Sequence, residues 1–160
     1  GEEANLWLLK GIQLLVNSLD KQILNDGMHY ELSPSYHVQV LEDLLCIRRS
    51  LDCCRLEKVS NFDIKEIKEK LDHFICSMYK AMSLLTHPDG MPSLFNDGGL
   101  HMAPAPKLIE EEILTNGIEV EQFNLEKNLV WSLNDSGYYG LSNKENTFIL
   151  DCGKVSPLDL

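Results

Sequence analysis

The sequence has no long apolar stretch. Its uninterrupted apolar runs are short, such as Leu14-Leu15-Val16, whereas a membrane-spanning helix needs roughly 18 or more apolar residues in succession. We therefore expect no insertion into a membrane. The chain is 44% hydrophobic and 24% charged, which is ordinary for a globular protein and excludes a disordered or collagen-like one.

Basic residues are scarce. Lys and Arg number 14 against 25 Asp and Glu, which gives a formal net charge of −11. The adjacent arginines Arg48 and Arg49 have Glu42, Asp43 and Asp52 close by in the sequence. Because nucleic-acid binding depends on clustered Lys and Arg that neutralise phosphates, this charge argues against a nucleic-acid partner.

Cysteine occurs five times, an odd number, and no two cysteines have the Cys-x-x-Cys spacing. Both facts argue against a disulfide framework and against a zinc-thiolate site. We expect the cysteines to be buried small hydrophobic residues, and free thiols are typical of a reducing compartment such as the cytoplasm. The chain begins with Gly1 rather than Met, and we expect it to be a piece of a longer protein.

The first hundred residues have the periodicity of helices. One apolar stripe advances by three or four residues at a time and comprises Leu8, Ile12, Leu15, Leu19 and Ile23. Asn25-Asp26-Gly27 follows this stripe as a helix stop. A second helix is predicted to begin at Ser33-Pro34, with the serine as N-cap and the proline in the first turn. Its predicted core face is Val40, Leu44, Ile47, Leu51 and Cys54.

A third helix is predicted to begin at Asn61 or Asp63 and to end before His87-Pro88-Asp89-Gly90. Its predicted stripe is Ile64, Ile67, Leu71, Phe74 (or Ile75), Met78, Met82 and Leu85. Asp26-Gly27-Met28 recurs as Asp89-Gly90-Met91, 89 − 26 = 63 residues later. This recurrence favours stacked antiparallel helical hairpins, which occur both in solenoids and in closed α/α toroids. Chance recurrence of a common turn dipeptide is the alternative.

The pattern changes after residue 100. Residues 1–100 are predicted to be the helical region, 101–127 a linker with a short helix at 108–114, and 128–160 the start of a β domain. Apolar runs at 130–133, 138–141 and 147–150, separated by turn residues, predict antiparallel strands. The expected fold class is mainly α: antiparallel helical hairpins of an incomplete α/α toroid, followed by a few antiparallel strands.

The densest polar cluster lies between the first two predicted helices, from His29 to His37. It combines two histidines, two tyrosines, a glutamate and two serines in a loop and the following helical turn. A simple capping loop accounts for these residues. A metal site at His29, Glu31 and His37 is the alternative, although their spacing matches no standard pattern. Paired carboxylates of a hydrolase, Asp26 and Glu31, are a third alternative.

Residues 22–37, QILNDGMHYELSPSYH, resemble a stretch that is common in the heparinase II/III family of polysaccharide lyases, QILPDGGHxERSPxYH. Three further segments are similar to that family in the same order: His87-Pro88-Asp89-Gly90 with Leu94-Phe95-Asn96-Asp97, then residues 135–139, then 148–153. Asn25, Met28 and Leu32 differ from it, because they stand where the family usually has Pro, Gly and Arg.

The resemblance implies an α/α toroid followed by a β-sandwich, and cleavage of acidic, uronic-acid-containing polysaccharides such as glycosaminoglycans by β-elimination. It implies Tyr36 as the catalytic tyrosine and His29, Glu31, His37 and Asn96 as residues that contact or orient the sugar. It implies that this piece holds no metal. Zinc, where family members bind it, is expected in parts of the β-sandwich beyond Leu160. It also implies a bacterial protein of the cell envelope or periplasm.

We expect this piece to be inactive alone. The residue that neutralises the substrate carboxylate is expected before Gly1, and the histidine that completes the site is expected after Leu160. Apolar surface left uncovered at these ends is expected to favour self-association. A helical-repeat interaction module without chemistry is the alternative function, which the acidic charge favours.

Overall fold

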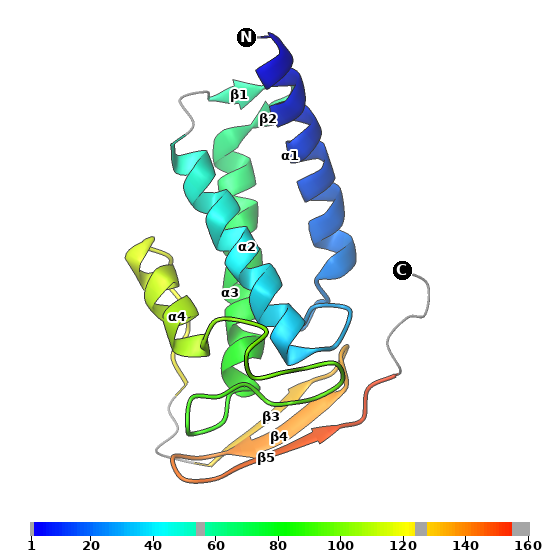
Figure 1. Ribbon diagram of the computed structural model, residues 1–160, viewed down its shortest axis with the longest axis vertical. Helices are drawn as coiled ribbons and strands as arrows, with labels where there is room; N and C mark the ends of the chain where they lie inside the picture. The colour runs from blue at the N-terminus through cyan, green and yellow to red at the C-terminus, as the bar shows by residue number, and fades with distance from the viewer. Residues whose placement is uncertain (1, 54–56, 124–127, 155–160) are drawn as a thin grey trace.

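The computed structural model describes residues 2–53, 57–123 and 128–154. The elements in chain order are α1 (Glu2–Gln22), α2 (Pro34–Asp52), β1 (Lys58–Val59), β2 (Phe62–Asp63), α3 (Ile64–Leu84), α4 (Pro106–Thr115), β3 (Leu129–Leu133), β4 (Tyr138–Ser142) and β5 (Thr147–Asp151). The first three helices alternate in direction, and a three-stranded sheet lies across the end of the bundle where α3 ends (Figure 1). The expected fold class, mainly α with antiparallel helices followed by antiparallel strands, is confirmed. The division at residues 100 and 127 stays a prediction.

Side-chain caps begin α2 and α3 where the sequence predicts them. The Ser33 hydroxyl oxygen accepts a hydrogen bond from the Tyr36 backbone N–H at 3.4 Å. The Asp63 carboxylate accepts one from the Lys65 N–H at 2.8 Å. Each cap satisfies one of the backbone donors that the first helical turn leaves unpaired, which stabilises a helix by about 1 kcal/mol.

The main core lies between the helices, and its α2 face is wider than the predicted stripe. Leu41 and Leu45 are fully buried, whereas the predicted core residues Val40 and Ile47 are only partly buried. The reason is that α2 packs against both α3 and α4, so one narrow stripe cannot serve both contacts. On α3, Ile75 rather than Phe74 is fully buried. Cys54 lies outside the described residues.

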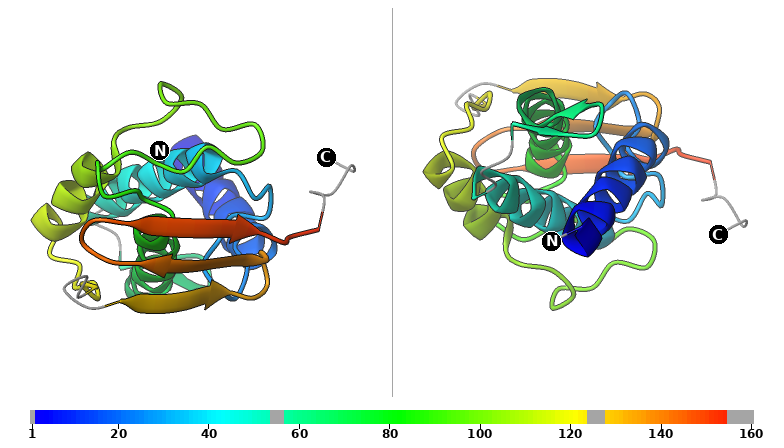
Figure 2. Two further views of the ribbon diagram at one scale, coloured as in Figure 1. Left: turned by 90° about the horizontal axis from the view of Figure 1, so that it is seen from below. Right: turned by 90° about the horizontal axis from the view of Figure 1, so that it is seen from above.

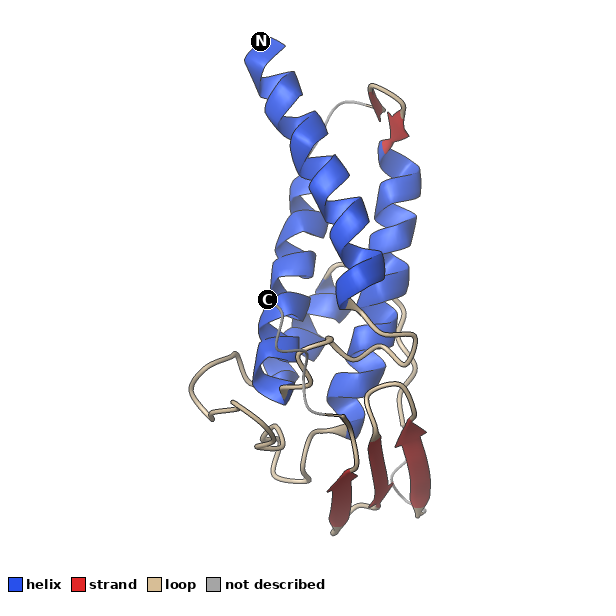
Figure 3. Cartoon of the chain, turned by 90° about the vertical axis from the view of Figure 1, so that its right-hand side faces the viewer, coloured by secondary structure: helices blue, strands red, loops and turns tan. Residues whose placement is uncertain are grey.

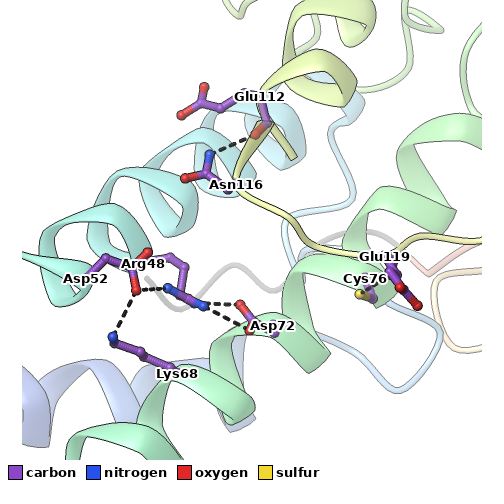
Figure 4. A network of polar contacts seen from close by, with 8 residues as sticks. All are labelled: Arg48, Asp52, Lys68, Asp72, Cys76, Glu112, Asn116 and Glu119. Carbon is purple, nitrogen blue, oxygen red and sulfur yellow. Dashed lines mark hydrogen bonds and ion pairs between the residues drawn. The ribbon is translucent and has the colours of Figure 1, made fainter. Parts of the chain in front are cut away.

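A cluster of charged side chains connects the C-terminal part of α2 to α3 (Figure 4). The Arg48 guanidinium forms ion pairs with Asp72 at 2.7 Å and with Asp52 at 2.5 Å. Lys68 also binds Asp52, at 2.8 Å. The cluster ties the two helices together.

The expectation of buried cysteines is wrong for most of the thiols that the structure describes. Cys46, Cys53 and Cys152 are exposed, Cys76 is half-buried, and all four are free. The Cys76 thiol donates a weak hydrogen bond to the Glu119 carbonyl at 3.4 Å. The exposed thiols lie on the solvent side of α2 or just after β5, where no neighbouring element covers them.

A short hairpin between α2 and α3 was not predicted. Lys58 pairs with Asp63 and Val59 with Phe62 in antiparallel register. Strands of two residues are too short to produce a detectable alternation of polar and apolar side chains.

The sheet has the order β3-β4-β5, is antiparallel throughout, and packs one face on the ends of the helices (Figure 3). The three predicted strands match β3, β4 and β5 to within one residue at either end. A second core lies between sheet and helices, with Tyr138 fully buried in it. Trp131 crosses β4 at Gly140, where an added Cβ would lie 2.2 Å from the indole ring. Only glycine allows this contact.

The two Asp-Gly turns share one geometry. Ile23 bridges His29, and 63 residues later Thr86 bridges Pro92. In each turn the aspartate accepts a hydrogen bond from the N–H two residues on, at 3.1 Å for Asp26 and 2.9 Å for Asp89. The recurrence in the sequence therefore corresponds to a recurrence in structure.

The segment between α3 and α4 passes over the start of α2, and Figure 2 shows it extending beside the sheet. The Ser35 hydroxyl oxygen accepts from the Gly99 N–H at 3.1 Å and the hydroxyl donates to the Gly99 carbonyl at 3.2 Å. The Gln39 amide donates to the Met102 carbonyl. In the part of the chain that the structure describes, no helix has the length and apolar character needed to cross a membrane.

Candidate active site

An open concavity of about 380 Å³ lies beside the start of α2. Residues from the end of α1, from the following loop and from the first turns of α2 line it: Gln22, His29, Tyr30, Glu31, Tyr36, Gln39, Val40 and Asp43. The concavity brings together Tyr36, His29 and Glu31, which the sequence predicted for the site. It does not include His37 or Asn96. Another cavity, of about 340 Å³ between α3, α4 and the sheet, contains none of the five.

Tyr36 is well placed to meet a ligand. It stands in the first turn of α2, where the Ser33 cap holds its backbone N–H. Its side chain is half-buried on the wall of the concavity. Within the described residues no hydrogen-bond partner of its hydroxyl is found. The phenol is therefore free to bind a group that enters the concavity.

His37 does not line the concavity, so in this conformation it is not placed for direct contact with a ligand there, and a role in orienting the sugar stays a prediction. It is fully buried, because α2 turns it towards α3. Its Nδ1 accepts a hydrogen bond from the His29 backbone N–H at 3.1 Å, and its Nε2 lies 2.9 Å from the Met78 carbonyl. Since Nδ1 is the acceptor, Nε2 carries the proton and donates it to that carbonyl. Burial lowers the pKa of His37 to about 4. Neutral His37 therefore connects the loop before α2 to α3 through these two hydrogen bonds.

His29 lies at the base of the concavity with one ring nitrogen unused. His29 as a whole is 4% exposed, and its Nδ1 is buried with no hydrogen-bond partner among the described residues. The ring packs edge-on against Tyr30, with 4.8 Å between the centroids. Burial lowers the pKa of His29, and the Glu31 carboxylate opposes that shift only in part. The lowered pKa favours the neutral form of His29 at pH 7.

The charged groups of the concavity are acidic. Glu31 is half-buried and Asp43 exposed, and no Lys or Arg from the described part of the chain lines the concavity. Burial first, and then the Glu31 carboxylate, raises the pKa of Tyr30. Gln39, Val40 and Asp43 were missed from the sequence. The signal was available, because they follow Tyr36 by three, four and seven residues and so share its helix face.

Asn96 and Asp26 have partners elsewhere. The Asn96 amide donates to the Leu32 carbonyl at 2.7 Å and to the Tyr138 hydroxyl oxygen at 3.1 Å. The Asp26 carboxylate binds Ser136, so it forms no carboxylate pair with Glu31. Asn96 therefore contacts the loop that carries the site, and its contact with the sugar stays a prediction.

No group of three His, Cys, Asp or Glu side chains that could hold a metal ion is found among the described residues. At the alternative metal site, His37 cannot serve as a ligand in this conformation, because both of its ring nitrogens have protein partners.

Comparisons with known proteins point in one direction. The family described as Heparinase II/III N-terminus matches residues 2–111. A heparin-sulfate lyase of Pedobacter heparinus is 31% identical over 91 residues, which are 57% of this chain and 13% of that protein. A heparin-sulfate lyase of Bacteroides thetaiotaomicron is 24% identical over 96 residues, 60% of this chain and 14% of that protein. The chain thus spans about one seventh of the length of these relatives.

The fold has solved counterparts. The crystal structure of the heparan sulfate lyase HepC from Pedobacter heparinus has a TM-score of 0.63 and 23% sequence identity, covering 94% of this chain and 25% of that one. A HepC mutant gives the same TM-score and covers 91% of this chain and 24% of that one. At this identity the likeness shows the shared fold. The family match spans more than two thirds of the sequence, and the chain therefore belongs to the heparinase II/III family.

Proposed function

We propose that this chain is part of a polysaccharide lyase that cleaves uronic-acid-containing glycosaminoglycans by β-elimination, with Tyr36 as the proton donor. The observation that supports this most is the Tyr36 hydroxyl on the wall of an open concavity, without a partner among the described residues and with neutral His29 beside it. Family membership and the names of the relatives, heparin-sulfate lyases, support the substrate class.

The reaction balances with a phenol as acid. A base removes the proton from C5 of the uronic acid, and the electron pair left on C5 forms the C4–C5 double bond. The C4–O4 bond breaks with its electrons moving to O4, and Tyr36 gives its proton to that oxygen. A phenol ordinarily stays protonated at neutral pH, so it can act as this general acid.

The remaining groups of the concavity have supporting roles. The His29 ring and the Glu31 carboxylate form hydrogen bonds with sugar hydroxyls, the carboxylate as acceptor, and so orient the sugar ring at Tyr36. Among residues 2–53, 57–123 and 128–154, no Lys or Arg lines the concavity. The C5 proton, however, becomes acidic enough only when the neighbouring carboxylate is neutralised. The neutralising group and the base are therefore to be supplied by parts of the full protein outside this chain, and this chain alone is inactive.

The proposal extends to the fold and the cellular location of the whole protein. The helical hairpins form part of an α/α toroid, and the protein acts in a bacterial cell envelope or periplasm. Zinc, where it occurs, binds outside these residues.

The test uses the full-length protein with heparan sulfate and follows the ultraviolet absorbance of the unsaturated uronate product. Tyr36→Phe removes only the hydroxyl, and we expect kcat to fall by about a hundredfold or more, as for loss of a general acid. Tyr139→Phe, on the exposed outer face of β4, is the matched control and keeps full activity. An active Tyr36→Phe enzyme would remove Tyr36 from the mechanism.

The acidic concavity and the net charge of −11 favour one second candidate, a non-catalytic helical interaction module. A wild-type full-length protein that yields no unsaturated product from any uronate polysaccharide would support that function instead.

A further inference from the structure

The backbone next to the concavity is held in a sterically disfavoured conformation. Leu32, between Glu31 and the N-cap Ser33, has a φ of +58°. In this left-handed region the Cβ of an ordinary side chain crowds the following carbonyl, and a branched apolar residue has no compensating hydrogen bond. Such a conformation persists only where the surroundings over-determine it, and it occurs most often at functional sites.

Both backbone polar groups of Leu32, the N–H and the carbonyl, form hydrogen bonds. Its N–H donates to the His29 carbonyl at 2.9 Å. Its carbonyl accepts from the Tyr138 hydroxyl at 2.6 Å and from the Asn96 amide at 2.7 Å. Because a carbonyl oxygen has two lone pairs, these two donors saturate it.

The two donors come from separate parts of the chain and support each other. Asn96 also donates to the Tyr138 hydroxyl oxygen at 3.1 Å, which closes a triangle of hydrogen bonds. The Phe95 ring packs on the Tyr138 ring with 5.3 Å between the centroids. Tyr138 is fully buried at the start of β4, and burial, with the Asp151 carboxylate adding to it, raises the pKa of its phenol. Its hydroxyl is therefore a permanent donor.

We propose that Asn96 and Tyr138 are positioning residues, which hold Leu32 in its left-handed conformation and thereby fix Glu31 and Tyr36 at the concavity. Leu32 is followed directly by the N-cap whose oxygen binds the Tyr36 N–H, and it is preceded by Glu31 on the concavity wall. If Leu32 relaxes to an ordinary φ, the chain direction changes between these two groups. The catalytic part of this inference rests on the proposed lyase function.

The test compares variants of the full-length protein with and without relief of the strain. Asn96→Gly removes one donor from an exposed residue, and glycine tolerates the φ of +53° at this position. Tyr138→Phe removes the other donor while keeping the buried ring. We expect each to lower kcat on heparan sulfate about tenfold with KM changed less than twofold, as for a displaced acid rather than a lost binding contact. We also expect faster amide hydrogen exchange in residues 29–36.

Rescue distinguishes positioning from direct participation. Glycine adopts positive φ without a steric cost, so Leu32→Gly combined with Asn96→Gly is expected to restore most of kcat and the slow exchange. Ser60→Gly is the matched control, because Ser60 has a φ of +57° in the β1–β2 turn, away from the concavity. Combined with Asn96→Gly it restores neither.

Failure of the inference is separable from failure of the proposed function. The exchange measurement needs no turnover, so it decides whether Asn96 and Tyr138 hold the loop even if the wild type proves inactive. Unchanged exchange and kcat in both single variants would overturn the inference. Loss of kcat that Leu32→Gly does not restore would also overturn it, since Asn96 would then act on the substrate directly.

Discussion

The carboxylate of Asp26 accepts two hydrogen bonds from Ser136, from its backbone N–H at 2.7 Å and from its hydroxyl at 2.9 Å. Asp26 lies in the loop before α2, and Ser136 lies in the turn between β3 and β4, 136 − 26 = 110 residues later in the chain. The turn that leads into β4 therefore holds the beginning of the same loop whose end, at Leu32, is held by Tyr138. The loop that carries His29 and Glu31 is fixed at both ends by one hairpin.

Loss of the Asp26 carboxylate is expected to destabilise the fold. Asp26→Ala removes the local bond from the Met28 N–H and the two charge-assisted bonds from Ser136. The Ser136 N–H loses its acceptor, and the Ser136 hydroxyl keeps only the Leu133 carbonyl at 3.4 Å. The free energy of unfolding should fall by about 2–3 kcal/mol. Urea unfolding measures this. Asp89→Ala is the matched control, because Asp89 makes the same local turn bond to Met91 but is exposed; its cost should be about 1 kcal/mol or less. Equal losses in the two variants would contradict the bridging role of Asp26.

Stability is expected to depend on pH through His37. Its pKa falls from 6.5 in the unfolded chain to about 4 in the fold, so between these values the unfolded state binds more protons. The stabilisation from neutral His37 is therefore fully present above pH 6.5 and is lost as the pH falls towards 4, by at most about 3 kcal/mol.

Urea unfolding at a series of pH values tests this. His37→Gln should flatten the pH dependence between 6.5 and 4, whereas His73→Gln, at an exposed position of α3, should leave it as in the wild type. The shift at His29 has the same direction, so some slope remains in the His37 variant. An unchanged slope in that variant would show that His37 titrates normally.

The two Asp-Gly turns are expected to differ in their tolerance of a side chain. Gly27 and Gly90 both have positive φ, +88° and +82°. A Cβ on Gly27 would lie 2.2 Å from the Ser77 carbonyl oxygen, whereas one on Gly90 would meet nothing within 4 Å. Gly90→Ala should therefore cost only the backbone strain, about 1 kcal/mol, and Gly27→Ala about 3 kcal/mol or more. Thermal unfolding compares them, and similar melting temperatures would be inconsistent with the close packing of the first turn on α3.

The ion cluster between α2 and α3 is expected to stabilise the bundle through Arg48 rather than Arg49. The Arg48 side chain is 14% exposed and binds two carboxylates. The Arg49 side chain is 53% exposed and binds the Glu112 carboxylate and the Cys46 sulfur. Arg48→Met should lower the free energy of unfolding by about 1–2 kcal/mol, and Arg49→Met by about 0.5 kcal/mol or less. Chemical denaturation in low and high salt measures both. Equal effects would mean that burial adds nothing to the Arg48 pairs.

Local sequence determined the helices α1, α2 and α3, the caps of α2 and α3, and the strands β3, β4 and β5. Ser33 and Asp63 cap the helices that they were expected to begin, and the apolar runs after residue 128 form the three strands at nearly the predicted bounds. These features depend on interactions within a few residues, so spacing and residue type reveal them. The resemblance of residues 22–37 to the heparinase II/III family likewise depends on contiguous residues, and the family match agrees with it.

Tertiary structure decided which polar residues face the concavity. His37 follows Tyr36 directly in the sequence, yet one step of about 100° around the helix turns it into the core, where Met78 from α3 binds it. Asn96 and Tyr138 meet at the Leu32 carbonyl from segments 64 and 106 residues away. Hydrogen bonds at such separations leave no periodicity in the sequence, because they depend on how helices and sheet pack rather than on the spacing of neighbouring residues.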